Sequence, residues 1–321
     1  MKSKAILILG AGGFVGKQLI NCLSQNGYSK IHAVGHHVDR FPPLPGVYYH
    51  SANIDNVSLL NDLLPECQQV FHLACASTPG SSVLGPVFEI EHNLLPTLRF
   101  LEVMKNYPHV SLVYLSTGGA LYGNAIPVAM QVQEQTPPAP LSYYGAGKAA
   151  LEHFITAFCN QQQRSSVILR PANFYGPLQS YKPGFGIVPT IFNCLSLNQP
   201  LQIWGDGEVV RDYLFITDFI ELCLTLVKSP PTQIGAKIYN VGSQQGTSLN
   251  GLCDLIEKIT GESIQRQYHI SRNVDVQRIV LDCSRIYQDY HWTARTDLLT
   301  GLDLTWHWFK NRTLKSETWE Y

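Results

Sequence analysis

The sequence predicts an α/β protein with a doubly wound parallel sheet and a smaller C-terminal lobe. Three observations lead to this fold class. In the first half, short apolar runs alternate with longer amphipathic segments, and this alternation is typical of a parallel sheet covered by helices. A glycine-rich turn follows the first apolar run. After Arg170 the alternation gives way to loops that contain proline and glycine.

Buried strands are expected at 5–9, 31–34, 70–73, 112–115 and 166–169. Helices are expected at 17–25, 57–64 and 93–105, and another begins near Gly145. Later helices are expected at 188–197, 218–228 and 249–260, while 239–243 and Ser248 fit a strand and a helix N-cap. We therefore assign residues 1–170 mainly to the sheet domain and 171–312 mainly to a partly interleaved lobe. Residues 313–321 are expected to form a polar tail.

Composition excludes several classes of function. Of the 321 residues, 45% are hydrophobic and 15% charged, as in ordinary globular proteins, and the net charge is −1. No broad basic field is present, so we expect neither nucleic acid nor a membrane as partner. No apolar run reaches the roughly 20 residues that span a bilayer. The eight dispersed cysteines show no metal-ligand spacing; buried, reduced thiols, no metal and a cytoplasmic location are expected.

The first predicted strand leads directly into the turn 10–16, Gly-Ala-Gly-Gly-Phe-Val-Gly. Glycines at such a turn let the backbone approach a pyrophosphate, and the N–H groups at the start of the following helix can bind its oxygens. A glycine-rich turn alone is often only a turn. Its position between a strand and a helix favours dinucleotide binding, and the predicted cofactor contacts here are Gly10, Gly13, Phe14, Val15 and Gly16.

The spacing of these glycines resembles the extended branch of the short-chain dehydrogenase/reductase superfamily, the NAD-dependent epimerase/dehydratase family with UDP-glucose 4-epimerase-like members. Asn53-Ile54-Asp55 resembles the family's segment at the adenine, and 71–75 resembles its fourth strand, which ends against the cofactor. The resemblance extends to about Lys310. It implies a Rossmann-type fold, with further cofactor contacts at Asn53, Ile54, Leu73 and Ala74.

One position departs from the family pattern. Gly35 stands where NAD-preferring members place an aspartate that hydrogen-bonds the adenosine ribose. His36, His37 and Arg40 follow, and His36 is predicted to contact the cofactor. These polar residues could equally form a solvated loop. NAD is the expected cofactor, and NADP remains the alternative.

Tyr144 and Lys148 form a Tyr-x-x-x-Lys pair at helical spacing, so both side chains lie on one helix face. A free tyrosine titrates near pKa 10, and a neighbouring ammonium with the cationic nicotinamide is expected to favour the phenolate. Isolated pairs of this kind are usually surface pairs. In the context of the family, Tyr144 is the predicted proton carrier and Lys148 its partner at the cofactor ribose.

The third catalytic group is expected in the loop 115–123. The family's usual hydroxyl position is occupied by Gly118, so Thr117 is predicted to take its place, with Ser116 as a further substrate contact. A strand cap is the alternative reading of Thr117. The loop lacks the Asp-Glu pair of 4,6-dehydratases and the glutamate of sugar-acid decarboxylases, which argues against both reactions.

Later segments resemble the family's nucleotide-sugar site. In 169–177, Pro171 is expected beside the nicotinamide amide and Asn173 at the substrate diphosphate. Trp204 would lie against the nucleotide base. Arg211 would bind the diphosphate through its planar fork, and Arg272 with Asp275 would close over phosphate and ribose.

The predicted function is therefore a nucleotide-sugar 4-epimerase acting through a transient 4-keto sugar, with a UDP-hexose or UDP-N-acetylhexosamine as substrate. The alternatives are a reductase of nucleotide-linked 4-keto sugars and a non-catalytic NAD(P)-binding regulatory protein. Ile279, near the position that limits room for an N-acetyl group, leaves the sugar open. Members of the family typically form homodimers through a helix pair that includes the helix of Tyr144, and a homodimer is expected here.

Overall fold

The computed structural model describes residues 4–78, 85–124, 130–271 and 276–314. Its main feature is a seven-stranded sheet in the order β10-β6-β5-β4-β1-β2-β3, in which every pairing is parallel. The strands are β1 (Ala5–Leu9), β2 (Ile31–Gly35), β3 (Val47–Ser51), β4 (Cys67–His72), β5 (Ser111–Leu115), β6 (Ser165–Pro171) and β10 (Gly235–Val241). The predicted doubly wound parallel sheet is confirmed.

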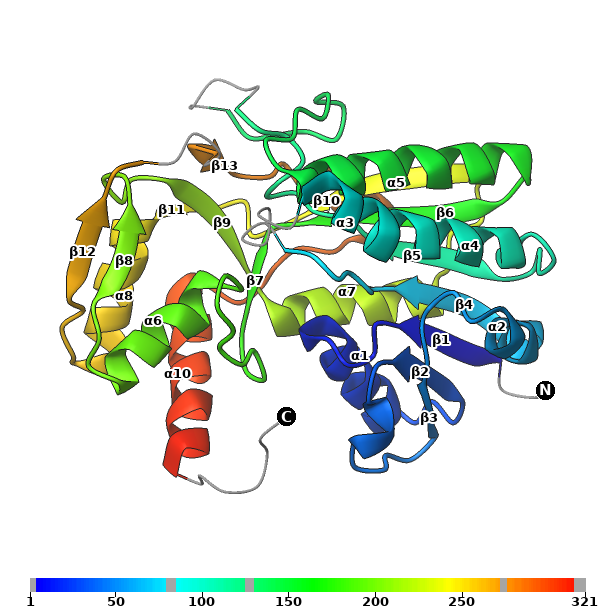
Figure 1. The fold of residues 1–321 in the computed structure, drawn as a ribbon, viewed down its shortest axis with the longest axis horizontal. Coiled ribbons are helices and arrows are strands. Elements are labelled where there is room, and N and C mark those ends of the chain that lie inside the picture. The colour runs from blue at the N-terminus through cyan, green and yellow to red at the C-terminus, as the bar shows by residue number, and fades with distance from the viewer. Residues whose placement is uncertain (1–3, 79–84, 125–129, 272–275, 315–321) are drawn as a thin grey trace.

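Strand β1 is buried on both faces, which explains its unbroken apolar sequence. Ile6 and Ile8 pack in one core, with helices α1 (Phe14–Gln25) and α7 (Ile216–Lys228). Leu7 and Leu9 pack in a second core, with α2 (Val57–Leu63), α4 (Leu95–Met104) and α5 (Tyr143–Gln161). Figure 1 shows α4 and α5 along one face of the sheet and α1 and α7 along the other.

The strand order places a switch point at β1. The chain moves from β1 to β2 and β3 on one side, then crosses back to add β4 on the other. In open parallel sheets, ligands bind at the carboxyl ends of the strands beside such a point. Between β4 and α4 lie α3 (Gly85–Glu89) and the π-helical turn η4 (Ile90–Leu94). The ends of β1, β4 and β5 are therefore where the site is expected.

The smaller lobe has its own core, which includes Phe192, Leu252 and Leu302. Its helices are α6 (Ile187–Ser196), α8 (Leu249–Thr260) and α10 (Leu298–Leu314), and Ser248 caps α8 by accepting a hydrogen bond from Gly251 N, as predicted. Its strands are β7 (Asn173–Tyr175), β8 (Leu201–Trp204), β9 (Val210–Phe215), β11 (Gly246–Ser248), β12 (Arg266–His269) and β13 (Arg278–Ile279).

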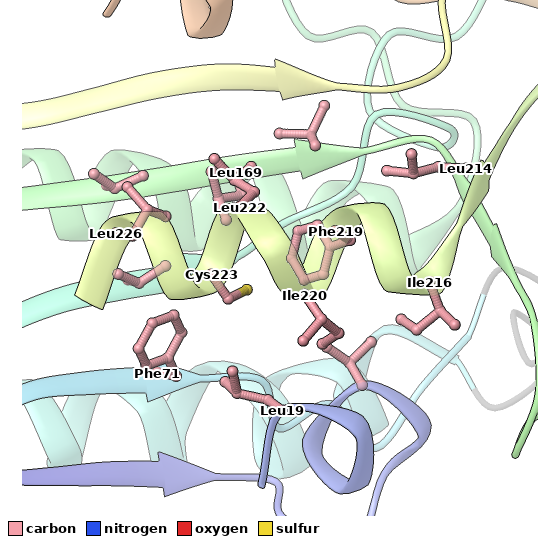
Figure 2. Packing of buried hydrophobic residues seen from close by; sticks show 14 of the residues in the cluster. Leu19, Phe71, Leu169, Leu214, Ile216, Phe219, Ile220, Leu222, Cys223 and Leu226 are labelled. Atoms are coloured by element: carbon pink, nitrogen blue, oxygen red, sulfur yellow. The ribbon is translucent and has the colours of Figure 1, made fainter. Parts of the chain in front are cut away.

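The two parts of the chain interleave. Strand β10 and helix α7 come from beyond residue 170, yet β10 completes the sheet beside β6 and α7 fills the face next to α1. Figure 2 shows Phe219 and Leu222 of α7 packed between strands of the sheet and Leu19 of α1. A short helix, α9 (Ser284–Tyr290), then packs against β10.

Several features differ from the sequence predictions, and three of them are informative. Strand β3 was not predicted, because its residues are half-buried or exposed at the sheet edge and carry polar side chains. Helix α10 was not predicted either. All eight cysteines are free, but Cys22 and Cys194 are only partly buried, and Cys75 is exposed rather than buried. The reason for the exposure of Cys75 is that it lies just past the end of β4, where the burial of the strand ends.

The described part of the chain holds no helix long and apolar enough to cross a membrane. Nor do the described residues bring together three or more His, Cys, Asp or Glu side chains that could hold a metal ion.

Candidate functional site

The turn after β1 has a geometry that only glycine allows. Gly10 has φ +90°, and a Cβ atom there would lie 2.5 Å from Ala74 N. A Cβ at Gly16 would lie 2.4 Å from Gly10 O, so helix and turn pack backbone to backbone. Gly13 caps α1 without a side-chain hydrogen bond, which leaves N–H groups of the first helical turn for an external acceptor. This cradle fits a dinucleotide pyrophosphate, and the fit rests on Gly10, Gly13, Phe14, Val15 and Gly16.

The end of β2 borders the same turn. A Cβ at Gly35 would lie 3.2 Å from Gly12 N. The exposed His36 donates from Nε2 to Asn53 Oδ1 over 2.7 Å, so two of the predicted cofactor contacts meet here. Ile54 is partly buried against the core beneath them. Leu73 and Ala74, at the end of β4, lie against Gly10.

Helix α5 carries Tyr144 and Lys148 to the carboxyl ends of β4 and β5. Ser142 starts the helix by accepting a hydrogen bond from Gly145 N. Lys148 is buried and donates from Nζ to Leu115 O over 2.7 Å, and its ammonium lies 5.9 Å from the centre of the Tyr144 ring. The Thr117 side chain lies close enough to the Tyr144 phenol to lower its pKa. The structure thus brings together all three predicted catalytic residues.

The protonation of Tyr144 is set by its surroundings in the protein. Burial raises the pKa of its phenol well above the usual value, the charges of Cys75 and Glu89 raise it further, and the neighbouring Thr117 side chain lowers it. We expected the Lys148 ammonium to favour the phenolate. In the protein alone, burial outweighs any such effect, because the ammonium lies beside the ring and is hydrogen-bonded to a carbonyl.

The loop after β5 explains why residue 118 is glycine. A Cβ there would lie 2.7 Å from Leu281 Cδ1 and 3.0 Å from the carbonyl oxygens of Arg170 and Pro171. A hydroxyl side chain at 118 would therefore displace Leu281 and press on the backbone of β6. Thr117, one residue earlier, instead places its hydroxyl at Tyr144.

Ser116, predicted to contact the substrate, is buried and its hydroxyl donates to Glu152 Oε1 over 2.5 Å. Because a buried carboxylate needs donors around it, this contact stabilises Glu152 in the interior. The predicted contact of Ser116 with substrate stays a prediction.

This buried cluster was not predicted. Glu152, on α5, forms an ion pair with Arg170 of β6, with Nη2 to Oε2 at 2.6 Å and both side chains about 4% exposed. Arg170 Nη1 also donates to the Tyr122 hydroxyl over 2.7 Å, and Tyr122 donates to Asn240 Oδ1 of β10. Burial alone would lower the pKa of Arg170, but the hydrogen bonds and charge of Glu152 raise it. One sequence signal was available: Glu152 follows Lys148 by four residues on one helix.

Strand β7 follows β6 directly and pairs with β9 of the smaller lobe. Its first residue, Asn173, lies opposite Tyr213 of β9, two residues beyond Arg211. The Asn173 side-chain oxygen lies 2.9 Å from the position of a Cβ on Gly119. Arg211 is half-buried and pairs in register with Ile279 of β13. Asn173, Arg211 and Ile279 are thus linked, through two short strand pairs, to the loop that carries Thr117.

Trp204 ends β8 with 41% of its surface exposed, and its ring lies 5.7 Å from that of His269 on β12. An exposed indole of this kind can stack on a planar base. Arg272 and Asp275, predicted to close over the phosphate and ribose, lie outside the described residues.

Comparisons with known proteins agree with this architecture. The sequence profile of the NAD dependent epimerase/dehydratase family matches residues 6–242. A UDP-glucose 4-epimerase of Mycolicibacterium smegmatis is 28% identical over 315 residues, which cover 95% of this chain and 98% of that protein. The crystal structure of a UDP-glucose 4-epimerase from Thermotoga maritima, with UDP-glucose, has a TM-score of 0.88 at 28% identity and covers 97% of this chain and 100% of its own. The crystal structure of the UDP-glucose 4-epimerase of Thermus thermophilus in complex with NAD has a TM-score of 0.85 at 27% identity. The match covers 95% of this chain and 99% of that one.

Proposed function

Because the chain belongs to the NAD-dependent epimerase/dehydratase family, we propose that it is an NAD-dependent epimerase that inverts C4 of a nucleotide sugar, with a UDP-linked hexose or N-acetylhexosamine as substrate. One observation carries the proposal: Tyr144, with Thr117 beside its phenol, lies on the helix face of Lys148, which is fixed to the end of β5, and the neighbouring strand β4 ends against the glycine turn. The similarity over 95% of the chain to a UDP-glucose 4-epimerase supports the substrate class.

Each residue of the site has a separate role in the proposed reaction. When bound, the nicotinamide cofactor supplies a hydride acceptor that later returns the same hydride. Tyr144 takes the proton from the C4 hydroxyl and gives it back, while Thr117, whose side chain lies beside the phenol, orients it. Lys148, fixed by Leu115 O, places a positive charge beside the Tyr144 ring. Asn173 and Arg211 would hold the diphosphate and Trp204 the base.

Two features of the site favour this reaction over its relatives. An epimerase returns its hydride to the same sugar and needs no further acid. A dehydratase must also eliminate water, and the loop Ser116-Thr117-Gly118 carries no carboxylate for that step. Glu152, the carboxylate that the Ser116 hydroxyl contacts, is already paired with Arg170.

Incubation of the purified protein with UDP-glucose or UDP-N-acetylglucosamine, without added reductant, tests the proposal. We expect the 4-epimer to accumulate until substrate and product reach equilibrium. The anomeric proton signals in NMR spectra measure the amounts of both sugars. Strict consumption of a reduced dinucleotide with a 4-keto sugar, without any interconversion, would instead identify a reductase. Absence of both activities would favour the regulatory alternative.

We also propose that the protein forms a homodimer through α5 and the α3–α4 segment. These helices contact one another along one face of the sheet. Apolar side chains stay exposed along them: Val87, Ile90 and Leu95 on one side and Phe154 on α5. A cluster of exposed apolar residues on adjacent helices is a typical protein interface.

Phe154→Glu is expected to convert this dimer into a monomer, because it would place a charge in the centre of an apolar contact. Light scattering after gel filtration should show the mass fall from twice to once the 35.9 kDa of the chain. Tyr287→Glu changes another exposed aromatic residue, on α9, and should leave the mass unchanged. A dimeric Phe154→Glu variant, or a monomeric parent protein, would refute the proposed interface.

A further inference from the structure

The end of β2 lies where a dinucleotide's adenosine ribose meets the protein in folds of this kind. In such folds, an acidic residue there hydrogen-bonds the ribose 2′-hydroxyl and repels a 2′-phosphate. This chain has Gly35 instead. A Cβ at that position would lie 3.2 Å from Gly12 N and 3.4 Å from Ala11 N, so a side chain at 35 would start directly against the phosphate-binding turn.

We propose that this end of the glycine turn accepts a 2′-phosphate, so that NADP binds this protein about as well as NAD. The inference rests on the proposed function and refines it, since it concerns the cofactor of the same site. The feature that carries it is the juxtaposition of Gly35, Gly12 and the His36–Asn53 pair at one end of the turn.

The polar groups that replace a carboxylate here are donors. His36 Nε2 donates to Asn53 Oδ1 over 2.7 Å. This contact uses the amide oxygen of Asn53 and leaves its NH₂ group to donate elsewhere. A phosphate needs donors, whereas a ribose hydroxyl can either donate or accept. The donor that this pair can offer a 2′-phosphate is therefore the Asn53 amide group, and neither side chain of the pair carries a negative charge.

Two carboxylates lie nearby, and each has partners. Asp39, in the short 3₁₀ turn η1 (Val38–Arg40), accepts a hydrogen bond from the Ser51 hydroxyl, which lowers the pKa of its carboxyl and favours the charged form, and the positive charges of Arg40 and His37 lower that pKa further and partly offset this charge. Asp55 pairs with Arg99 over 3.2 Å. On α1, the Lys17 ammonium lies 4.6 Å from the centre of the Phe41 ring and adds a positive charge to this side of the turn.

The two dinucleotides can be compared by binding alone. The purified protein, freed by dialysis of any dinucleotide it carries, is titrated with NAD⁺ and with NADP⁺ in a calorimeter. For the parent protein, we expect the two dissociation constants to agree within about tenfold. For Gly35→Asp, NADP⁺ binding should weaken by about thirtyfold or more through charge repulsion, with NAD⁺ binding changed less than about threefold.

Gly35→Asn is the matched control, because asparagine has the size of aspartate without its charge. A Cβ at residue 35 also lies 3.1 Å from Val38 Cγ1, so both variants meet the same slight crowding. Equal loss of NADP⁺ binding in both variants would overturn the charge argument. Parent protein that binds NADP⁺ more than tenfold weaker than NAD⁺ would overturn this inference and leave the proposed function intact. Failure to bind either dinucleotide would overturn both.

Discussion

Replacing Tyr144 by phenylalanine is expected to slow the interconversion of 4-epimers by about 10²–10⁴-fold, the usual contribution of a positioned proton-transfer group. The substitution removes only the hydroxyl, so the ring can keep its place beside the Lys148 ammonium. Lys148 keeps its hydrogen bond to Leu115 O, and the glycine turn is untouched. Initial rates measured with UDP-glucose, together with NAD⁺ affinity, test the prediction.

Tyr143→Phe is the matched control for this variant. Tyr143 is the preceding residue on the same helix, but 49% of it is exposed, and we expect its loss to leave the rate unchanged. Dinucleotide affinity of the Tyr144→Phe variant should stay within about threefold of the parent. If that variant keeps more than about a tenth of the parent rate, Tyr144 does not carry the proton.

The largest expected effect on stability is at Glu152. Replacing it by glutamine keeps its shape but leaves the Arg170 guanidinium buried without a counter-charge. Breaking a buried pair in this way costs about 3–5 kcal/mol of the free energy of unfolding. The contact from the Ser116 hydroxyl to Oε1 at 2.5 Å would also weaken, because it would lose its charged acceptor. Urea denaturation followed by circular dichroism measures the change.

Two further variants separate the pair itself from its surroundings. Glu102→Gln removes one partner of the exposed pair with Lys105 and should cost less than about 0.5 kcal/mol. Glu152→Leu combined with Arg170→Met removes both buried charges and should be more stable than Glu152→Gln, since no unpaired charge remains. Equal losses of unfolding free energy for Glu152→Gln and Glu102→Gln would mean that burial does not make the Glu152–Arg170 pair more costly to break than an exposed pair.

The sequence predicted those elements whose residue pattern is compatible with only one kind of structure. An apolar run such as Ala5–Leu9 can be buried on both faces only inside a covered sheet, and so it predicted β1 and the doubly wound fold. Strand β3 carries no such signal, because an edge strand needs only partial burial. Helix α10 lies in a lobe whose core forms between segments far apart in the sequence.

In the site, too, local patterns were predictable and contacts between distant segments were not. The spacing of Tyr144 and Lys148 is local, so the sequence could place both on one face of α5. The orientation of Ser116 toward Glu152 depends on how β5, β6 and α5 meet, and no spacing in the sequence encodes it. The departure at Gly118 was visible in the sequence, but its cause, the side chain of Leu281 from a distant segment, required the structure.

The late return of the chain to the sheet also determines when this protein can fold during synthesis. Strand β10 and helix α7 lie between residues 216 and 241, and until they emerge from the ribosome, β6 has an open edge and the face beside α1 lacks its cover. Until residue 241 has emerged, the sheet that begins with β1 therefore lacks one edge strand and one of its covering helices.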